Sequence, residues 1–424
     1  MNGTPKALKI SIGFFGRTNV GKSSIINLIT NQGVSIVSEI PGTTTDMVSK
    51  SMELPPVGPV NLIDTPGLDD GSQLGEQRLK VSRQVISTVD LIVLITDCFR
   101  WTQYEEWVLS ESKKYRTPVI IINNKTDLKP DVCDCKKTGR TTENQLNISC
   151  KELKDNESKR NSFINSLSGL ISGIVHHEEK ENLIFSDLIP GENKNVILVM
   201  PVDSEAPKGR LILPQVQTIR EALDNNISAI CVTPETFTRT LDSLSNPPAL
   251  VITDSQAVKE IAEKTPDSIT LTTFSILFSR LKGELKTLSA GAAELYCLKD
   301  NDKVLISEAC THHSTDEDIG RVKIPNLLRK FSGKNLKIEF AQGKDFYNVQ
   351  QDDYRLIIHC GGCMITRKEF NSRLNYCTEN NLHITNYGMA ISVFQNVLER
   401  TLKLFPEALA EFKNRKENPG KNEY

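Results

Sequence analysis

Three cysteines and two histidines stand in two short segments of the C-terminal half, at a spacing that suits a metal site. The first segment reads Cys310-Thr-His312 and the second reads His359-Cys360-Gly-Gly-Cys363, with 46 residues between the two histidines. Thiolates and imidazoles are the ligands that hold zinc and iron–sulfur clusters in proteins. The two segments therefore predict a metal centre built from distant parts of the chain.

Two kinds of metal centre fit these residues. Cys310, Cys360 and Cys363 with one histidine would form a closed, tetrahedral zinc site. The same three thiolates can hold a cubane iron–sulfur cluster, whose fourth iron is left to His312, His359, another ligand or solvent. The two glycines before Cys363 allow backbone N–H groups to turn towards sulfur atoms. Spacing alone leaves zinc and iron–sulfur equally open.

A second set of chemical residues lies near the N-terminus. The apolar run 8–15 leads into Gly16-Arg-Thr-Asn-Val-Gly21-Lys22-Ser23-Ser24, and a helical stretch follows through residue 29. A strand, a glycine-rich loop and a helix in this order form a phosphate-binding loop, because the glycines let backbone N–H groups curl round the phosphates. Lys22 would reach the β- and γ-phosphates, and Ser23 would hold Mg²⁺. The other expected nucleotide contacts in this loop are Gly16, Asn19, Val20, Gly21 and Ser24.

Further polar segments follow apolar runs of strand length, in the order that a nucleotide site needs. Asp64-Thr-Pro-Gly67 ends the run 60–64, which puts Asp64 near the Mg²⁺. Asn124-Lys125-Thr-Asp127 follows the run 119–123. The Asp127 carboxylate can accept two hydrogen bonds from the N1 and N2 edge of guanine, and adenine offers no such pair of donors. The loop Ser149-Cys150-Lys151 completes a predicted guanine-nucleotide site.

Length and composition limit the remaining possibilities. A chain of 424 residues should form about three domains. Its net charge of −2 argues against a large nucleic-acid-binding surface. The sequence has no run of about 18 apolar residues, so it predicts no membrane span. Ten scattered cysteines favour metal ligation in a reducing compartment over a disulfide scaffold. We therefore expect a cytoplasmic protein with no nucleic-acid and no membrane partner.

The alternation of strand-like and helical runs predicts an α/β protein: an N-terminal nucleotide-binding domain, then two smaller α/β domains with mostly parallel sheets. The middle domain has three βα units without a glycine-rich loop, so we expect it to mediate formation of a homodimer. Cys231, in an apolar strand, and Cys377, in an amphipathic helix, are expected in the core. The expected divisions are 1–175 for the GTP-binding domain, 176–194 for a linker, 195–265 for the dimerisation domain, 266–405 for the cysteine–histidine domain and 406–424 for a polar tail.

The N-terminal motifs resemble those of GTPases of the Era and TrmE group. The resemblance implies that Thr43 and Thr44 contact the nucleotide, with Thr44 at the Mg²⁺ and γ-phosphate, and that Asn19 matches an asparagine that binds K⁺. The sequence departs from related GTPases at Leu68, where Ras-like proteins carry a catalytic glutamine, and at Cys150, where alanine is usual. We therefore expect slow intrinsic GTP hydrolysis, below about 10 s⁻¹. The implied catalytic residues are Lys22, Thr44, Asp64 and Gly67.

The C-terminal pattern, Cys-x-His, 46 residues and His-Cys-x-x-Cys, resembles the signature of the HydF family of FeFe-hydrogenase maturation GTPases. Segments 206–214, 274–278 and 385–388 extend the resemblance over nearly the whole chain. It implies that Cys310, Cys360 and Cys363 hold a 4Fe–4S cluster, with His312 and His359 at motif positions. It also implies a scaffold that holds the diiron part of the hydrogenase active site and passes it to apo-hydrogenase, with two radical-SAM maturases as upstream partners.

A different function would use the same motifs. The alternative is an RNA- or ribosome-associated GTPase with a zinc-bound C-terminal domain. A third hypothesis is a purely structural adaptor that zinc holds together. The near-zero net charge and the lack of a stripe rich in Arg and Lys in the last domain weigh against RNA binding. Three thiolates with one exchangeable site favour a carrier, because a metal fragment can dock there and leave again.

Overall fold

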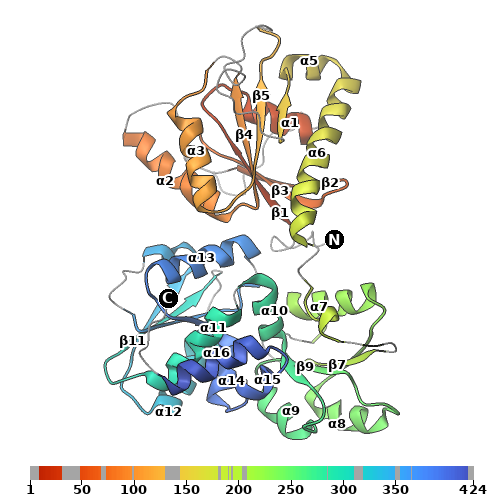
Figure 1. Cartoon of the computed structure of the whole chain (residues 1–424), viewed down its shortest axis with the longest axis vertical. Helices are drawn as coiled ribbons and strands as arrows, with labels where there is room; N and C mark the ends of the chain where they lie inside the picture. Colours follow the sequence, from red (N-terminus) through yellow and green to blue (C-terminus); the bar gives the residue numbers. More distant parts are fainter. Residues whose placement is uncertain are drawn as a thin grey trace. The chain divides into compact units, whose positions relative to one another are not determined.

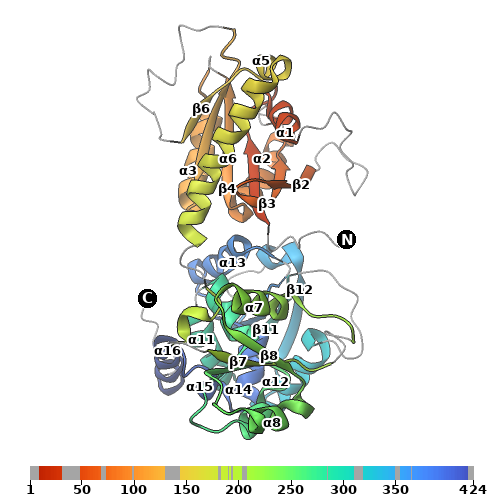
Figure 2. The ribbon, with the colours of Figure 1, turned by 90° about the vertical axis from the view of Figure 1, so that its right-hand side faces the viewer.

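The structure, a computed structural model, describes most of the chain. The described residues are 9–30, 48–67, 73–97, 100–128, 144–179, 183–189, 191, 194–202, 208–283, 285–309, 319–348, 354–363 and 365–418. The chain folds into two compact units, Met1–Glu181 and Asn182–Tyr424. Figure 1 shows both units coloured by sequence, from red at the N-terminus to blue at the C-terminus, and Figure 2 shows them turned by 90°.

The first unit is built on a six-stranded sheet with the order β2-β3-β1-β4-β5-β6. All neighbouring strands are parallel except the β2–β3 pair. The carboxyl ends of β1, β3, β4 and β5 therefore meet at one edge, where a parallel sheet places its ligand site. The strands are β1 (Ile10–Phe15), β2 (Val48–Leu54), β3 (Gly58–Asp64), β4 (Leu91–Asp97), β5 (Val119–Asn124) and β6 (Gln145–Asn147).

Helices cover both faces of this sheet (Figure 2). On one face, Ile25 from the first helix and Phe163 from the last pack in a common cluster with sheet residues. On the other face, Ile86 and Val108 pack against Phe15 and Leu94. This burial on two sides explains why the central strands are continuous apolar runs. The helices are α1 (Lys22–Thr30), α2 (Gln73–Thr88), α3 (Gln103–Lys114), α5 (Cys150–Asp155) and α6 (Glu157–Glu179).

The second unit contains two four-stranded parallel sheets, with the orders β10-β9-β7-β8 and β12-β11-β13-β14. The strands of the first are β7 (Asn195–Val199), β8 (Ser228–Val232), β9 (Leu250–Thr253) and β10 (Leu271–Thr273). Those of the second are β11 (Lys303–Glu308), β12 (Lys337–Gln342), β13 (Leu356–His359) and β14 (Ile384–Asn386).

One hydrophobic core joins the two sheets of the second unit. It contains Leu198 and Ile252 from one sheet and Ile306 and Ile358 from the other. The helices are α7 (Leu213–Asp224), α8 (Pro234–Ser243), α9 (Val258–Lys264), α10 (Phe274–Lys282), α11 (Leu285–Ala293), α12 (Ile324–Ser332), α13 (Arg367–Glu379), α14 (Tyr387–Phe394), α15 (Leu398–Thr401) and α16 (Pro406–Glu417). Short helical turns lie at η2 (Ser186–Leu188), η3 (Glu294–Cys297), η4 (Ile319–Lys323) and η5 (Gly343–Asn348).

Three segments differ from the divisions expected from sequence. Helix α6 continues through Glu179, and Phe185 within the expected linker is fully buried. The strand β10 lies beyond residue 265 but pairs with β9 in the first small sheet. Residues Pro406–Glu417 of the expected polar tail form α16, because Ala408 and Phe412 recur at helical spacing and pack into the core.

The expected fold class is confirmed: the described chain is α/β, with three sheets that are parallel apart from one edge strand. In the part of the chain that the structure describes, every helix is too short or too polar to cross a membrane.

Candidate functional site

The loop between β1 and α1 has the backbone that close approach to a phosphate requires. Asn19 and Gly21 adopt positive φ angles of 62° and 105°, a region that asparagine tolerates and glycine favours. A side-chain carbon on Gly16 would lie 2.4 Å from the carbonyl oxygen of Ile95. Glycine at 16 is therefore required for the loop to pass so close to β4.

Lys22 and Ser23 begin α1 and point back to the loop and to β3. The Lys22 ammonium is buried and donates to the carbonyl oxygens of Gly16 (2.8 Å) and Arg17 (3.0 Å). Ser23 Oγ donates to Asp64 Oδ2 at 2.8 Å. The structure thus brings together the lysine, the serine and the carboxylate that the sequence analysis assigned to the phosphates and Mg²⁺.

The Asp64 carboxylate fits a bound cation. Its Oδ1 is buried and has no hydrogen-bond partner among the described residues. Burial, the largest effect, raises the pKa of Asp64, while the Ser23 hydrogen bond and the Lys22 charge act in the opposite direction. A hydroxyl oxygen and a carboxylate oxygen side by side are the hard ligands that Mg²⁺ prefers.

Asn124 connects three loops on the base side of the site. Its Nδ2 donates to the carbonyl oxygen of Val20 (2.8 Å), and its Oδ1 accepts from the backbone N–H of Cys150 (3.0 Å). Lys125 follows with a positive φ of 63°, and Asp127 is exposed to solvent. Ser149 caps α5 by accepting from the backbone N–H of Glu152. Lys151, in the first turn of α5, is exposed.

The structure describes only some of the remaining residues that were predicted to contact the nucleotide. Gly67 lies against the phosphate loop, because a side-chain carbon there would be 2.6 Å from Thr18 Oγ1. Ser24 is half-buried on α1. Thr43, Thr44 and Leu68 lie outside the described residues.

Arg17, in the phosphate loop, was not singled out from sequence. Its guanidinium donates to Glu105 Oε1 at 2.7 Å and lies 3.2 Å from Asp97. Glu105 is fully buried and forms a capping box with Thr102 at the start of α3. The Thr-x-x-Glu pattern at 102–105 was the available signal. Arg17 therefore links the phosphate loop to the α3 N-terminus.

The two segments of the predicted metal centre follow neighbouring strands. β11 and β13 are parallel, with Ser307 opposite His359. Cys360 donates its backbone N–H to the carbonyl oxygen of Ser307 (2.8 Å), and its Sγ accepts from the backbone N–H of Ala309 (3.1 Å). Ala309, the residue before Cys310 in the sequence, therefore lies against the Cys360 sulfur. Cys363 is exposed three residues further on.

His359 points into the protein interior. It is fully buried, its Nδ1 lies 2.5 Å from the carbonyl oxygen of Cys360, and its Nε2 lies 2.9 Å from the guanidinium of Arg373. An Nδ1–H that donates to the carbonyl and an Nε2 that accepts from Arg373 satisfy both contacts. Burial, helped by the neighbouring Arg373 charge, lowers the pKa of His359 to about 3, so the imidazole is neutral. In this conformation both ring nitrogens of His359 are engaged away from the cysteines.

Arg373 is a second residue that sequence reasoning missed. It is fully buried in α13, donates to the carbonyl oxygen of Gly343 (2.9 Å) and lies over the Phe346 ring. Arginine in a helix usually indicates a solvated face, so no sequence signal separated this one from the rest.

The donor set tests whether a metal centre fits. Among the described residues, no group of three His, Cys, Asp or Glu side chains is close enough to hold a metal ion. Cys310 and His312 lie outside the described residues. Cys360 and Cys363 supply two thiols on one turn, and the Ala309 N–H contacts the first of them. These residues therefore fit a centre completed by Cys310.

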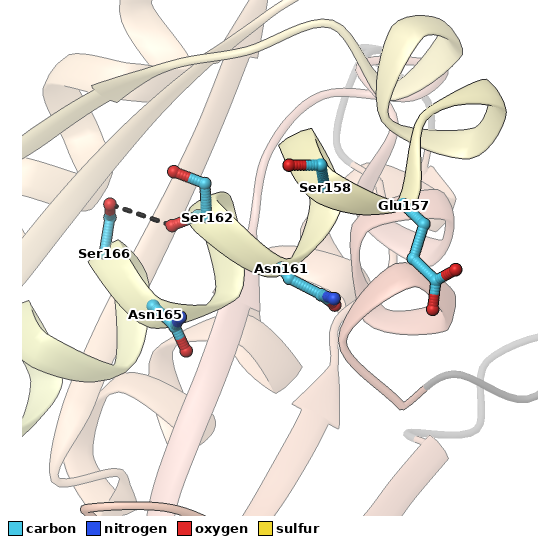
Figure 3. A pocket seen from close by; sticks show the side chains of 6 residues that line it. All are labelled: Glu157, Ser158, Asn161, Ser162, Asn165 and Ser166. Atoms are coloured by element: carbon cyan, nitrogen blue, oxygen red, sulfur yellow. Dashed lines mark hydrogen bonds between the residues drawn. The ribbon is translucent and has the colours of Figure 1, made fainter.

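A shallow hollow on the first unit lies elsewhere. It follows the polar face of α6 and is lined by Glu157, Ser158, Asn161, Ser162, Asn165 and Ser166 (Figure 3). The side chains point outward from one helix, and Ser166 Oγ donates to the carbonyl oxygen of Ser162. The hollow includes neither the phosphate loop nor a cysteine, so it is separate from the chemistry described above.

Three family models match successive parts of the chain. A model described as a 50S ribosome-binding GTPase matches residues 11–125. The hydrogen maturase F dimerization domain matches 184–283, and the hydrogen maturase F tetramerization domain matches 286–404. The last two together span just over half of the chain. The chain belongs to the hydrogen maturase F family.

The family match agrees with the resemblance inferred from the cysteine–histidine pattern. This hydrogen maturase F chain has both oligomerisation domains of the family, which supports the predicted self-association. Its first unit has the P-loop GTPase fold that the sequence analysis expected. The tetramerization model covers the segment in which we expected the metal centre.

Individual relatives match only the nucleotide-binding part of this hydrogen maturase F chain. The tRNA modification GTPase MnmE of Prochlorococcus marinus is 36% identical over 122 residues, which is 28% of this chain and 26% of that protein. GTPase Era of Marinobacter nauticus is 37% identical over 120 residues, 27% of this chain and 38% of that protein. The chain thus spans about a quarter of the length of its MnmE relatives. A solved structure of Aquifex aeolicus Era bound to GDP and AlF₄⁻ is 20% identical, with a TM-score of 0.29 over 53% of this chain and 94% of that one.

Proposed function

We propose that this protein is a GTP-hydrolysing scaffold that carries a 4Fe–4S cluster and delivers the diiron precursor to apo FeFe-hydrogenase. The contact between the Ala309 N–H and Cys360 Sγ is the observation that carries the proposal, because it sets the residue before Cys310 against a second predicted ligand. Two radical-SAM maturases would supply the precursor. The family membership supports the maturation function.

The nucleotide half of the proposal rests on the edge of the first sheet. Lys22 would bind the β- and γ-phosphates, while Ser23 and Asp64 would hold Mg²⁺, which offsets phosphate charge when bound. Asp127 would accept from the guanine edge, and Asn19 would contact K⁺. Thr44, Gly67 and the remaining loop residues complete the proposed site.

The cluster half rests on three cysteines. Cys310, Cys360 and Cys363 would each bind one iron, and the fourth iron would stay open to an exchangeable ligand. His359 would hold the end of β13 through Cys360 and Arg373, since both of its nitrogens are already engaged. His312 stays a candidate ligand. A cluster bound by three cysteines offers a coordination site to which a second metal fragment can bind reversibly.

Changing Cys310, Cys360 or Cys363 singly to alanine is expected to abolish the cluster. Each change removes one of three thiolates, and two thiolates do not retain a cubane cluster. After anaerobic reconstitution, the wild type should be brown with roughly four irons per chain and a reduced-cluster EPR signal. Each variant should lose most of the iron and the signal while it keeps GTP hydrolysis.

Cys231→Ala provides the matched control, because Cys231 is an exposed cysteine outside the motif. It should load iron like the wild type. Colourless wild-type protein with one zinc per chain would contradict the cluster proposal and favour the zinc-bound alternative.

The self-association surface that we propose is the edge strand β8. The backbone N–H of Ser228 and the carbonyl of Val232 bond to β7, so the alternate residues Ala229 and Cys231 direct their backbone groups outward. Since β8 has a neighbouring strand on one side only among the described residues, its outward groups are a template for a strand of a second copy. Val216 and Leu223 are exposed on α7, the helix that leads into β8. They are seven residues apart, so they lie on one face of the helix and extend the surface.

Ala229→Pro is expected to shift the protein toward monomers at micromolar concentration. Proline removes the outward N–H of residue 229 without touching a bond to β7. We expect the dissociation constant to rise at least about tenfold, roughly 1.4 kcal/mol, in sedimentation equilibrium. Ala229→Val adds similar volume but keeps the N–H, so it should self-associate like the wild type. Equal assembly of the two variants would exclude β8 pairing.

A further inference from the structure

We propose that Lys282 holds the Cys360–Cys363 turn in place and offsets the negative charge of a cluster bound there. Lys282 acts through the turn, so it is a positioning residue. The inference rests on the proposed cluster site. It assigns a function to a lysine that lies 28 residues before Cys310 in the sequence, outside every motif discussed above.

The fold delivers Lys282 to the turn from a separate helix. Lys282 is the last residue of α10, and Gly283 caps the helix. A side-chain carbon on Gly283 would lie 2.8 Å from Leu374 Cδ1 and 3.0 Å from Asn371 Oδ1 of α13. Glycine at 283 therefore allows the end of α10 to pack closely against α13, the helix that follows the cysteine turn.

The Lys282 ammonium binds the backbone of the turn at two points. It donates to the carbonyl oxygen of Gly362 in a short hydrogen bond and to that of Ile365 at 3.1 Å. The side chain is only 6% exposed. Gly362 has a positive φ of 62°, which reverses the chain between the two cysteines. Because the C=O and the next N–H of a peptide point in opposite directions, the Cys363 N–H faces away from Lys282.

The charge around Lys282 favours a loaded site. The titratable acidic groups that face it are, in order of influence, the thiols of Cys363 and Cys360 and the carboxylate of Glu369. Glu369 is also 3.5 Å from Arg373. Burial lowers the pKa of Lys282 to about 8, and the neighbouring acidic groups act in the opposite direction.

A buried cation needs a nearby negative charge to offset the loss of water. In the empty site the protonated thiols add no charge to that of Glu369, which also pairs with Arg373, whereas a cubane cluster with three thiolate ligands is a net anion. Lys282 should therefore stabilise the loaded site relative to the empty one, and the reduced cluster relative to the oxidised one. A lysine that only filled space would have neither effect.

The first test uses the full chain without a cluster. Lys282→Met keeps the length of the side chain but removes its donors, so we expect hydrogen exchange in peptides covering residues 359–366 to accelerate at least tenfold. Exchange in β1–β6 should stay unchanged. Lys286→Met is the matched control, because Lys286 lies on α11 four residues on, is exposed and pairs with Glu407. It should exchange like the wild type.

The second test uses the reconstituted protein. We expect Lys282→Met to lose iron to a chelator at least tenfold faster, and its cluster to have a more negative midpoint potential in an EPR-monitored titration. A tenfold change in the ratio of reduced to oxidised cluster corresponds to 59 mV for one electron. Lys282→Arg keeps the charge, so its potential should stay near that of the wild type.

The outcomes separate the two proposals. If the wild type does not take up iron, the cluster function fails, whereas the exchange experiment still reports on the turn. If the wild type loads and Lys282→Met matches it in exchange, iron retention and potential, the inference about Lys282 is overturned. If Lys282→Met does not fold, Lys282→Gln replaces it as the variant without the charge. A potential for Lys282→Gln equal to those of Lys282→Arg and Lys286→Met would then overturn the inference.

Discussion

Replacing Asp127 with asparagine is expected to weaken GTP binding about 100-fold or more and to strengthen binding of xanthosine triphosphate. The carboxylate would accept hydrogen bonds from both N1–H and N2–H of guanine, and hydrogen bonds to a charged group contribute about 1.5–3 kcal/mol each. Asparagine offers one acceptor and one donor, so its amide opposes the guanine amino group.

Xanthine has a carbonyl where guanine has that amino group, so its edge pairs with an asparagine amide. The surrounding structure should not be disturbed by the change, since Asp127 is exposed and the hydrogen bonds that connect the loops at Val20 and Cys150 are made by Asn124. The measurement is the dissociation constant for both nucleotides, obtained by calorimetry or from a fluorescent analogue.

Asp155→Asn, an equal change of charge at the exposed end of α5, provides the control and should bind GTP like the wild type. Loss of both nucleotides in Asp127→Asn would indicate a damaged loop rather than altered specificity. Unchanged GTP affinity would place the guanine elsewhere.

Gly291→Ala is expected to destabilise the second unit by about 3 kcal/mol or more, at the upper end for overpacked residues. A side-chain carbon on Gly291 in α11 would lie 1.9 Å from the carbonyl oxygen of Ile384 and 2.4 Å from its carbonyl carbon. These are backbone atoms of β14, which pairs with β13. Relief of the clash would move either the helix or the strand that supports the cysteine turn.

The matched change is Gly173→Ala in α6, where a side-chain carbon meets no heavy atom within 4 Å. Alanine there should stabilise the first unit by roughly 0.5–1 kcal/mol, because it restricts the unfolded chain and favours helix. Urea unfolding followed by circular dichroism should show a lower free energy of unfolding for Gly291→Ala and a higher one for Gly173→Ala. If Gly291→Ala unfolds at the wild-type urea concentration, the close contact between α11 and β14 is wrong.

The sheets and their ligand edges were predictable because strand-length apolar runs and the residues that end them are local in sequence. Asp64, Asn124 and Cys360 each follow such a run, and parallel pairing brings those ends together. Cys377 was also predicted correctly, since amphipathic spacing placed it in the core, where it is fully buried.

Features that depend on strand order or on contacts between distant elements were not predictable. The apolar run around Cys231 indicated a buried strand, but β8 is a sheet edge and Cys231 is exposed. His359 and Lys282 owe their surroundings to α13 and to the turn that precedes it. Neither the fold of α10 onto α13 nor the burial of Arg373 leaves a pattern in the local sequence.

The two hydrogen bonds of Asn124 have a consequence for how the protein distinguishes its nucleotide states. One side chain ties the phosphate loop at Val20 to the base loop at Cys150, so these two loops form one rigid platform. A platform of this kind holds GDP and GTP alike, since both share the base and the first two phosphates. A response to the third phosphate must then involve other residues, and the segment that begins at Asp64, the last residue of β3, and continues to Gly67 beside Thr18 is the one available.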